Sequence, residues 1–154
     1  MERTLIIAKP DAVQRGLIGE IIARLERKGL KLIGIKMAHL DEAILRTHYA
    51  EHLEKPFYAG LEDFMKSSPV VLMAWEGYEC IESVRLIVGD THPRDAQAGT
   101  IRGDFAIGIG RNLIHASDSK DSGEREVNNF FKPEELFDYD KSEYMHIYED
   151  NERS

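Results

Sequence analysis

The segment TLIIAK, residues 4–9, is the feature that most restricts how this chain can fold. It is an unbroken apolar run that ends in a lysine, and Pro10 follows it directly. A continuous apolar run of this length is typical of a strand that is buried on both faces. The run therefore predicts a strand at the centre of a sheet.

Helical spacing of apolar residues appears in several later segments. In residues 16–29 the apolar side chains at 17, 18, 21, 22 and 25 form one stripe, and Gly29 is placed to end the helix. Residues 80–88 show similar spacing and are followed by Gly89. Further helices are expected over residues 41–53 with Asp41 as cap, over residues 58–66, and from a cap at Ser119 or Ser122, with Val127, Phe130 and Phe131 facing the core.

Strand-like segments alternate with these helices. KLIGIKM, residues 31–37, has Ile33, Ile35 and Met37 at alternate positions, which predicts a strand with one buried face. Further strands are expected at VVLMAWE (70–76) and at FAIGI and NLIHA within residues 105–116.

The order of these segments is β-α-β-(helices)-β-α-β-α. It predicts an α+β fold with a ferredoxin-like βαββαβ core, an antiparallel sheet with covering helices, an inserted helical hairpin and a long loop at residues 89–104. A loop of that length is usually functional or disordered. The length suits one domain over residues 1–154, of which 140–154 form an acidic tail. This fold carries many functions, so the site must decide between them.

The charge distribution limits the classes of partner. The formal net charge is −8, but residues 1–116 hold 15 Lys or Arg and 16 Asp or Glu, whereas residues 117–154 hold 5 and 12. A local basic pocket can therefore still attract phosphates, while nucleic acid is not expected as a primary partner. The single cysteine, Cys80, favours a cytoplasmic setting. No run of 18 apolar residues is present, so no membrane span is expected.

Familiar phosphate-binding and metal-binding motifs are missing. The sequence has no GxxxxGK[ST] loop, and the GxGxxG pattern at residues 108–113 has Leu113 at the third glycine position. The six histidines and the cysteine lack the spacing of a structural zinc site. Any phosphate chemistry must therefore use separate side chains brought together by the fold.

The stretch GRNLIHASDS, residues 110–119, leaves two interpretations open for its histidine. His115 is either a core histidine in a strand or a nucleophile beside a phosphate. A histidine nucleophile needs a residue that fixes its tautomer, and it needs cations where phosphoryl charge develops. Glu126 and Ser117 can supply the first, although each has a structural alternative. Candidates for the second are Lys9, Arg85 and Arg102, each of which alone is more often a solvated surface charge.

At these residues the chain resembles the nucleoside diphosphate kinase family. The resemblance runs from Arg3 to about Tyr139 and rests on segments in the expected order and spacing: RTLIIAKPDAVQRGLIGEII, HYAEHLEKPFYAGL, SSPVVLMAWEG, GTIRGDF, GRNLIHASDS and FKPEEL. The resemblance implies a ping-pong transfer of the γ-phosphoryl group from a nucleoside triphosphate to a nucleoside diphosphate. The group would be carried on Nδ1 of His115, with Glu126 and Ser117 orienting the ring.

The resemblance also implies roles for other residues. Lys9 and Tyr49 would act at the transferring phosphate; Arg85, Thr91 and Arg102 would bind the other phosphates; Lys9 and Asn112 would reach the sugar; Phe57 would stack on the base, with Ile109 on its other side. Mg²⁺ would be held by the nucleotide phosphates and not by protein ligands. ATP, GTP and other nucleotides would be substrates, and a homo-oligomer, a hexamer in preference to a tetramer, is expected. The competing interpretation is a non-catalytic nucleotide- or nucleic-acid-binding regulator of the same fold.

Overall fold

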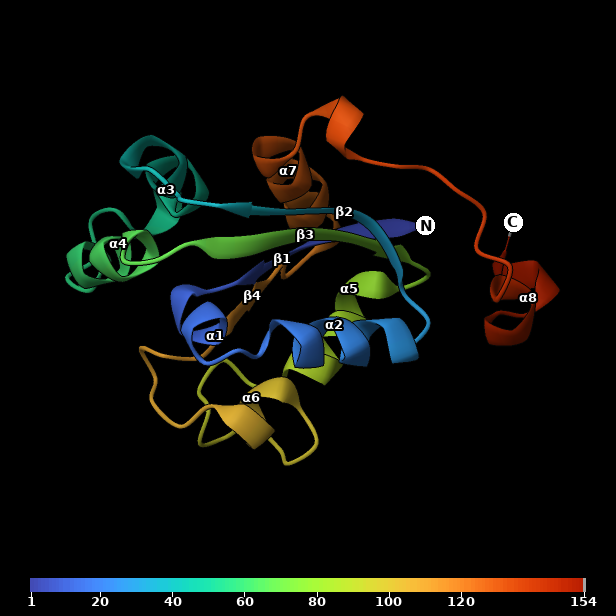
Figure 1. Ribbon diagram of the computed structural model, residues 1–154, viewed down its shortest axis with the longest axis horizontal. Coiled ribbons are helices and arrows are strands. Elements are labelled where there is room, and N and C mark those ends of the chain that lie inside the picture. Colours follow the sequence, from blue (N-terminus) through green and yellow to red (C-terminus); the bar gives the residue numbers. More distant parts are fainter. Residues whose placement is uncertain (154) are drawn as a thin grey trace.

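An antiparallel sheet forms the centre of the protein. The computed structural model describes residues 1–153. Within them the sheet has strand order β2-β3-β1-β4, and every neighbouring pair is antiparallel (Figure 1). This order, with helices in the connections, is the predicted ferredoxin-like arrangement. The strands are β1 (Glu2–Ala8), β2 (Lys31–Ala38), β3 (Val70–Gly77) and β4 (Ile114–Ala116).

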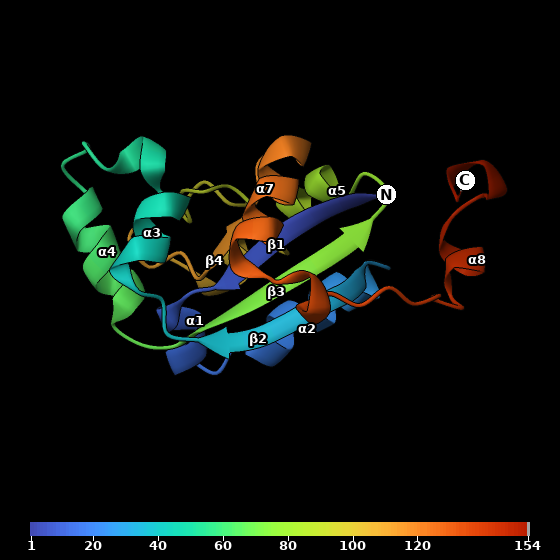
Figure 2. The ribbon, with the colours of Figure 1, turned by 90° about the horizontal axis from the view of Figure 1, so that it is seen from above.

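Helices cover both faces of the sheet. Figures 1 and 2 show α3 and α4 side by side at one end of the sheet and α8 beyond the other end. One face packs against α1 (Pro10–Gln14), α2 (Ile18–Arg27), α5 (Cys80–Val88) and α6 (Ile101–Phe105); the other packs against α3 (Glu42–His48), α4 (Tyr58–Lys66) and α7 (Lys120–Phe130). The remaining pieces are η1 (Ala50–His52), η2 (Pro133–Glu135), α8 (Tyr144–Ile147) and η3 (Asp150–Glu152). No helix among residues 1–153 is both long and apolar enough to cross a membrane.

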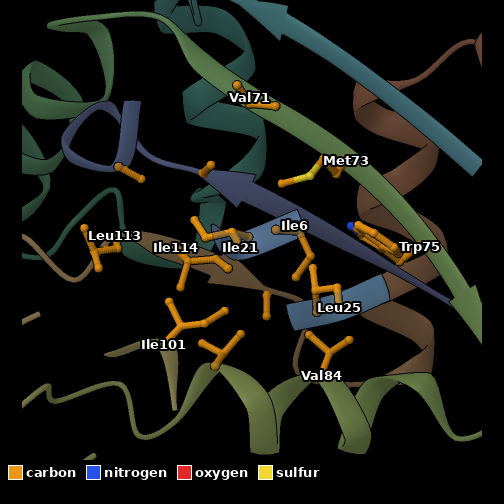
Figure 3. Close-up of a cluster of buried hydrophobic side chains, with 14 of the residues drawn as sticks. Ile6, Ile21, Leu25, Val71, Met73, Trp75, Val84, Ile101, Leu113 and Ile114 are labelled. Carbon is orange, nitrogen blue, oxygen red and sulfur yellow. The ribbon is translucent and has the colours of Figure 1, made fainter. Parts of the chain in front are cut away.

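Strand β1 is the central, doubly buried strand that the sequence predicts. It pairs with β3 on one side and β4 on the other, and Leu5, Ile6, Ile7 and Ala8 are all fully buried. Ile6 faces the cluster shown in Figure 3, together with side chains of α2 and α5. Leu5 and Ile7 face the second cluster, beneath α3, α4 and α7. Alternate side chains of the unbroken apolar run thus pack into two separate cores.

Strand β2 differs from its prediction. Ile33 is buried, but Ile35 and Met37 are 49% and 61% exposed. The register with β3 shifts between Leu32 and Gly34, so that an extra residue is inserted there. Because a bulge reverses the alternation of side chains, it places Ile33 on the opposite face from Ile35 and Met37. The strand also lies at the sheet edge, where the two apolar side chains lack cover.

Three further boundaries differ from the sequence-based expectations. The helix after Asp41 ends at His48 and is followed by a short 3-10 turn, although Asp41 caps it as predicted through its bond from the Ile44 amide. The long loop contains α6, capped by Thr100, whose hydroxyl accepts a hydrogen bond from the Gly103 amide at 2.9 Å. Residues 105–109 do not form a strand, and β4 covers only Ile114–Ala116.

Candidate active site

A cleft of about 890 Å³ contains almost all the predicted site residues. It lies where the ends of β1 and β4 meet α3, η1, α4 and the segment that precedes β4. Ser117 lies behind its wall and is fully buried. The predicted residues that line the cleft are Lys9, Tyr49, Phe57, Arg85, Thr91, Arg102, Ile109, Asn112, His115 and Glu126.

A second cavity, of about 550 Å³, lies at the opposite end of the sheet. It is also lined by charged side chains, but its two cations on β1 and β2, Arg3 and Lys31, pair with a lining carboxylate. Glu76 accepts from Lys31 at 2.9 Å and from Arg3 at 3.1 Å. Since these two cations are already neutralised, the first cleft is the better candidate for binding phosphates.

His115 is held by a buried carboxylate. It pairs with Ile7 in the sheet and so lies on the face that α7 covers. Its Nε2 is 2.9 Å from Glu126 Oε2, and the Ser117 hydroxyl donates to the same oxygen at 2.6 Å. Ser117 Oγ in turn accepts from the Leu5 amide at 3.0 Å. The predicted grouping of a histidine, a serine and a glutamate is therefore present in the fold.

Glu126 is ionised in this arrangement, and this sets the tautomer of the histidine. Its side chain is largely buried, which by itself raises the pKa of the carboxyl. The hydrogen bond and charge of His115, then the Ser117 hydroxyl, outweigh burial and leave the pKa of Glu126 below its usual value. A carboxylate only accepts, so a neutral His115 carries its proton on Nε2 and keeps a lone pair on Nδ1.

The backbone just before His115 has an uncommon conformation. Leu113 has φ +71°, a region that favours glycine. Its amide donates to Asp11 Oδ2 at 3.0 Å, and its carbonyl accepts from the Lys9 amide at 2.8 Å. These two bonds tie the start of α1 to the segment that carries His115, and they hold a conformation that would otherwise be unfavourable.

Lys9 and Asn112 form a polar pair at the wall of the cleft. Lys9 Nζ donates to Asn112 Oδ1 at 2.8 Å, and Asn112 Nδ2 donates to the Thr91 carbonyl at 3.0 Å. Burial, and then the nearby charge of Arg102, lower the pKa of Lys9 to about 8. Lys9 has no carboxylate in salt-bridge contact within residues 1–153, which leaves its charge available to an anionic ligand.

Arg102 has a structural task as well as a place in the cleft. Its guanidinium donates to the carbonyls of Gly89, Asn112 and Ile114 at 3.1, 3.2 and 2.6 Å. Burial, and then the charge of Arg85, lower its pKa to about 10. Arg85 itself is exposed on α5 and lines the same cleft. The two guanidinium groups therefore lie near each other, and neither forms a salt bridge within residues 1–153, a situation that favours a bound anion.

Two apolar side chains face the open part of the cleft. Phe57 is 54% exposed at the start of α4, and Ile109 is 62% exposed in the segment before β4. Tyr49 is buried at the end of α3, and burial raises the pKa of its hydroxyl well above the usual range. A flat aromatic group could enter between Phe57 and Ile109, which fits a nucleobase.

Comparison with known proteins identifies the fold and the family of the chain. The family model described as nucleoside diphosphate kinase matches residues 2–136. The chain belongs to the nucleoside diphosphate kinase family. Its activity is that of the family, phosphoryl transfer to a nucleoside diphosphate, and a non-catalytic regulator is not favoured.

Individual relatives match over nearly their whole length. The nucleoside diphosphate kinase of Archaeoglobus fulgidus is 51% identical over 150 residues, which is 97% of this chain and 99% of the relative. Nucleoside diphosphate kinase A of Homo sapiens is 51% identical over 148 residues, 96% of this chain and 97% of the relative. A solved nucleoside diphosphate kinase from Halobacterium salinarum in complex with CDP has a TM-score of 0.94 and 49% identity, and covers 96% of this chain and 99% of that chain.

Some side chains in or beside the cleft were given no functional role from the sequence. Asp11 supports the Leu113 backbone, and Arg111 lies over the Phe64 ring at 4.0 Å, which joins two walls of the cleft. His48 packs its ring against His115 with 4.6 Å between ring centroids. No local pattern marks these roles, since each depends on a contact between segments far apart in the sequence.

Proposed function

We propose that His115 carries the phosphoryl group between nucleotides. Nδ1 attacks the γ-phosphorus of a nucleoside triphosphate, the bond to the leaving diphosphate oxygen breaks, and the diphosphate departs. A second nucleoside diphosphate then takes the group from His115 by the reverse steps. The observation that supports this most is the bond from His115 Nε2 to the buried Glu126, because it leaves the Nδ1 lone pair toward the cleft. Ser117 keeps Glu126 in place.

Positive side chains of the cleft are proposed to bind the nucleotide phosphates. Lys9, with Tyr49 nearby, acts at the transferring group, while Arg85, Thr91 and Arg102 bind the other phosphates. Fixed cations at the place where charge develops lower the barrier of phosphoryl transfer. Asn112, already bonded to Lys9, is placed to reach the sugar hydroxyls together with it.

Mg²⁺ is proposed to enter bound to the nucleotide. Among the described lining residues the only carboxylates are Asp118 and Glu126, and Glu126 is already used by His115 and Ser117. This donor set fits a metal held mainly by phosphate oxygens. When bound, Mg²⁺ neutralises part of the phosphate charge, and the protein's own cations supply the rest.

The base is proposed to stack between Phe57 and Ile109. Stacking is sequence-tolerant because every base has a flat face, so ATP, GTP and other nucleotides are all expected as substrates. The complex of the Halobacterium salinarum relative with CDP is in line with such tolerance.

The oligomeric state and the cellular compartment are proposed from other parts of the molecule. We infer a homo-oligomer, a hexamer in preference to a tetramer, with each chain a single domain over residues 1–154. The support for association is the edge strand β2, on which Ile35 and Met37 are exposed. A cytoplasmic setting is proposed because the single cysteine, Cys80, is free and buried.

Labelling with γ-³²P ATP tests the phosphohistidine directly. With Mg²⁺ and no acceptor, the protein should gain an acid-labile, base-stable label, which any nucleoside diphosphate then removes. His115→Ala should gain none. If His115→Ala labels and transfers at the wild-type rate, the assignment of the nucleophile is wrong.

A further inference from the structure

His48 is a half-buried polar side chain that the proposed reaction does not use. It is the last residue of α3, and its ring meets the ring of His115 edge to face, at 4.6 Å and 84°. Tyr49 and Phe130 pack against it at 4.6 and 5.2 Å. Both of its ring nitrogens are buried and neither has a hydrogen-bond partner within residues 1–153. An unpartnered buried nitrogen is costly, and it would gain from a bond to an added group.

The unpartnered imidazole belongs to a three-residue cluster. One nitrogen of His48, one nitrogen of His115 and one carboxylate oxygen of Glu126 all lie within 4.8 Å of one another. Around a tetrahedral Zn²⁺ with bonds of about 2.0–2.2 Å, neighbouring donor atoms are roughly 3.3 Å apart. His115 Nε2 and Glu126 Oε2, at 2.9 Å, are already near that spacing. The His48 nitrogen lies within 4.8 Å of these two atoms, so its ring must move closer to reach that spacing.

The chemistry of the donors selects the kind of metal. Two imidazoles and one carboxylate suit Zn²⁺ and similar borderline ions, whereas Mg²⁺ prefers oxygen ligands. Both ring nitrogens of His48 are buried, which disfavours the charged form of the ring, so the neutral ring keeps a lone pair for a metal. Lys9 and Arg125 are close enough to oppose a further cation, so binding should be weaker than in a structural zinc site.

We propose that His48, His115 and Glu126 bind a divalent transition metal such as Zn²⁺, and that the bound metal blocks phosphorylation of His115. The blocking step rests on the proposed function of His115. The metal takes the place of the proton on Nε2 between His115 and Glu126. That proton moves to Nδ1, where it occupies the lone pair that would attack phosphorus. A metal-bound His115 therefore cannot accept the phosphoryl group.

Binding of the metal alone tests the site without nucleotide. We expect wild-type protein to bind one Zn²⁺ in calorimetry and to give the visible absorption of tetrahedral Co²⁺. His48→Gln and His48→Phe should each weaken binding at least about tenfold, the lower range for losing a group that supports a metal. The phenylalanine variant keeps an aromatic ring against His115, so a folded protein that fails to bind implicates the nitrogens. His52→Gln, which removes another cleft imidazole, should bind as wild type. Equal binding by wild type and both His48 variants overturns the proposed site.

The inhibitory effect is measured as labelling of His115 from γ-³²P ATP in saturating Mg²⁺ with rising Zn²⁺. Labelling of wild type should fall as Zn²⁺ rises. Labelling of His48→Phe should stay close to the rate that this variant shows without zinc. Zinc acting on the nucleotide alone would inhibit both equally, which would overturn the blocking mechanism. No labelling of wild type in Mg²⁺ alone would instead contradict the proposed function, and the binding measurements would still decide the metal site.

Discussion

Glu126 is a single buried carboxylate on which the orientation and tautomer of His115 depend. We expect Glu126→Gln to slow labelling of His115 by roughly 10²-fold, because the amide can donate as well as accept and no longer enforces a proton on Nε2. Single-turnover labelling measures this rate. Glu124→Gln, an exposed change on the same helix, should leave it unaltered. Equal rates for Glu126→Gln and wild type would show that the carboxylate does not set the tautomer.

Lys9 gives the site a dependence on pH. Its pKa is lowered to about 8, so the charged form prevails below that pH and is lost as the pH rises through it. Affinity for ADP should therefore fall above pH 8, by up to about tenfold per pH unit. The fall should end where the pH reaches the pKa that Lys9 has in the complex with ADP. Calorimetry with wild type and Lys9→Met tests this. The variant should bind weakly at every pH; a wild-type affinity that stays flat from pH 7 to 9.5 would contradict the assignment.

Phe57, at the start of α4, and Ile109, in the segment before β4, both line the cleft. Phe57→Ala should weaken binding of ADP, GDP and CDP alike by roughly 1–3 kcal/mol, because the stacking surface is lost for every base. Calorimetry on the three nucleotides measures it. A large change in base preference would mean that hydrogen bonds, and not stacking, select the base.

Helix α7 carries Glu126 and rests closely on β1. A Cβ added at Gly123 would meet the carbonyl oxygen of Arg3, so Gly123→Ala must push the helix away from the sheet. We expect a loss of about 1–3 kcal/mol in the free energy of unfolding, together with slower labelling as Glu126 moves from His115. Urea unfolding and labelling measure the two effects. Gly19→Ala in α2, where the added atom meets only open space, should cost nothing in either.

At the scale of the whole molecule, the uncovered side chains of β2 concern the assembly. Ile35→Glu together with Met37→Glu places charges on the exposed edge and should reduce the mass measured by light scattering, because burying them in a contact between chains is costly. Gln14→Glu, on another part of the surface, serves as a control. An unchanged mass would place the contact elsewhere, and a wild-type monomer would contradict the homo-oligomer.

The local pattern of residues was sufficient to predict most of the helices and strands. The apolar run of β1, the stripe of α2 ending before Gly29 at φ +99°, and the cap of α7 by Ser119 are each determined by neighbouring residues. The bulge in β2 was not predictable in this way, because it depends on the register with β3, 40 residues away in the sequence. The expected strand at 105–109 failed for a similar reason, since no strand pairs with this segment: Phe105 and Ala106 pack into the core, and Ile109 lines the cleft.

The same distinction between local pattern and tertiary contact applies to the candidate site. The sequence by itself determined the family, through matching segments along the chain, and with it the set of candidate residues. Only the tertiary structure decided which of them meet: His115 with Glu126 and Ser117, Lys9 with Asn112, and Arg102 with three carbonyl oxygens. It also revealed His48 beside His115. Hydrogen bonds and burial are properties of distances between atoms, and sequence spacing does not determine those distances for residues on different elements.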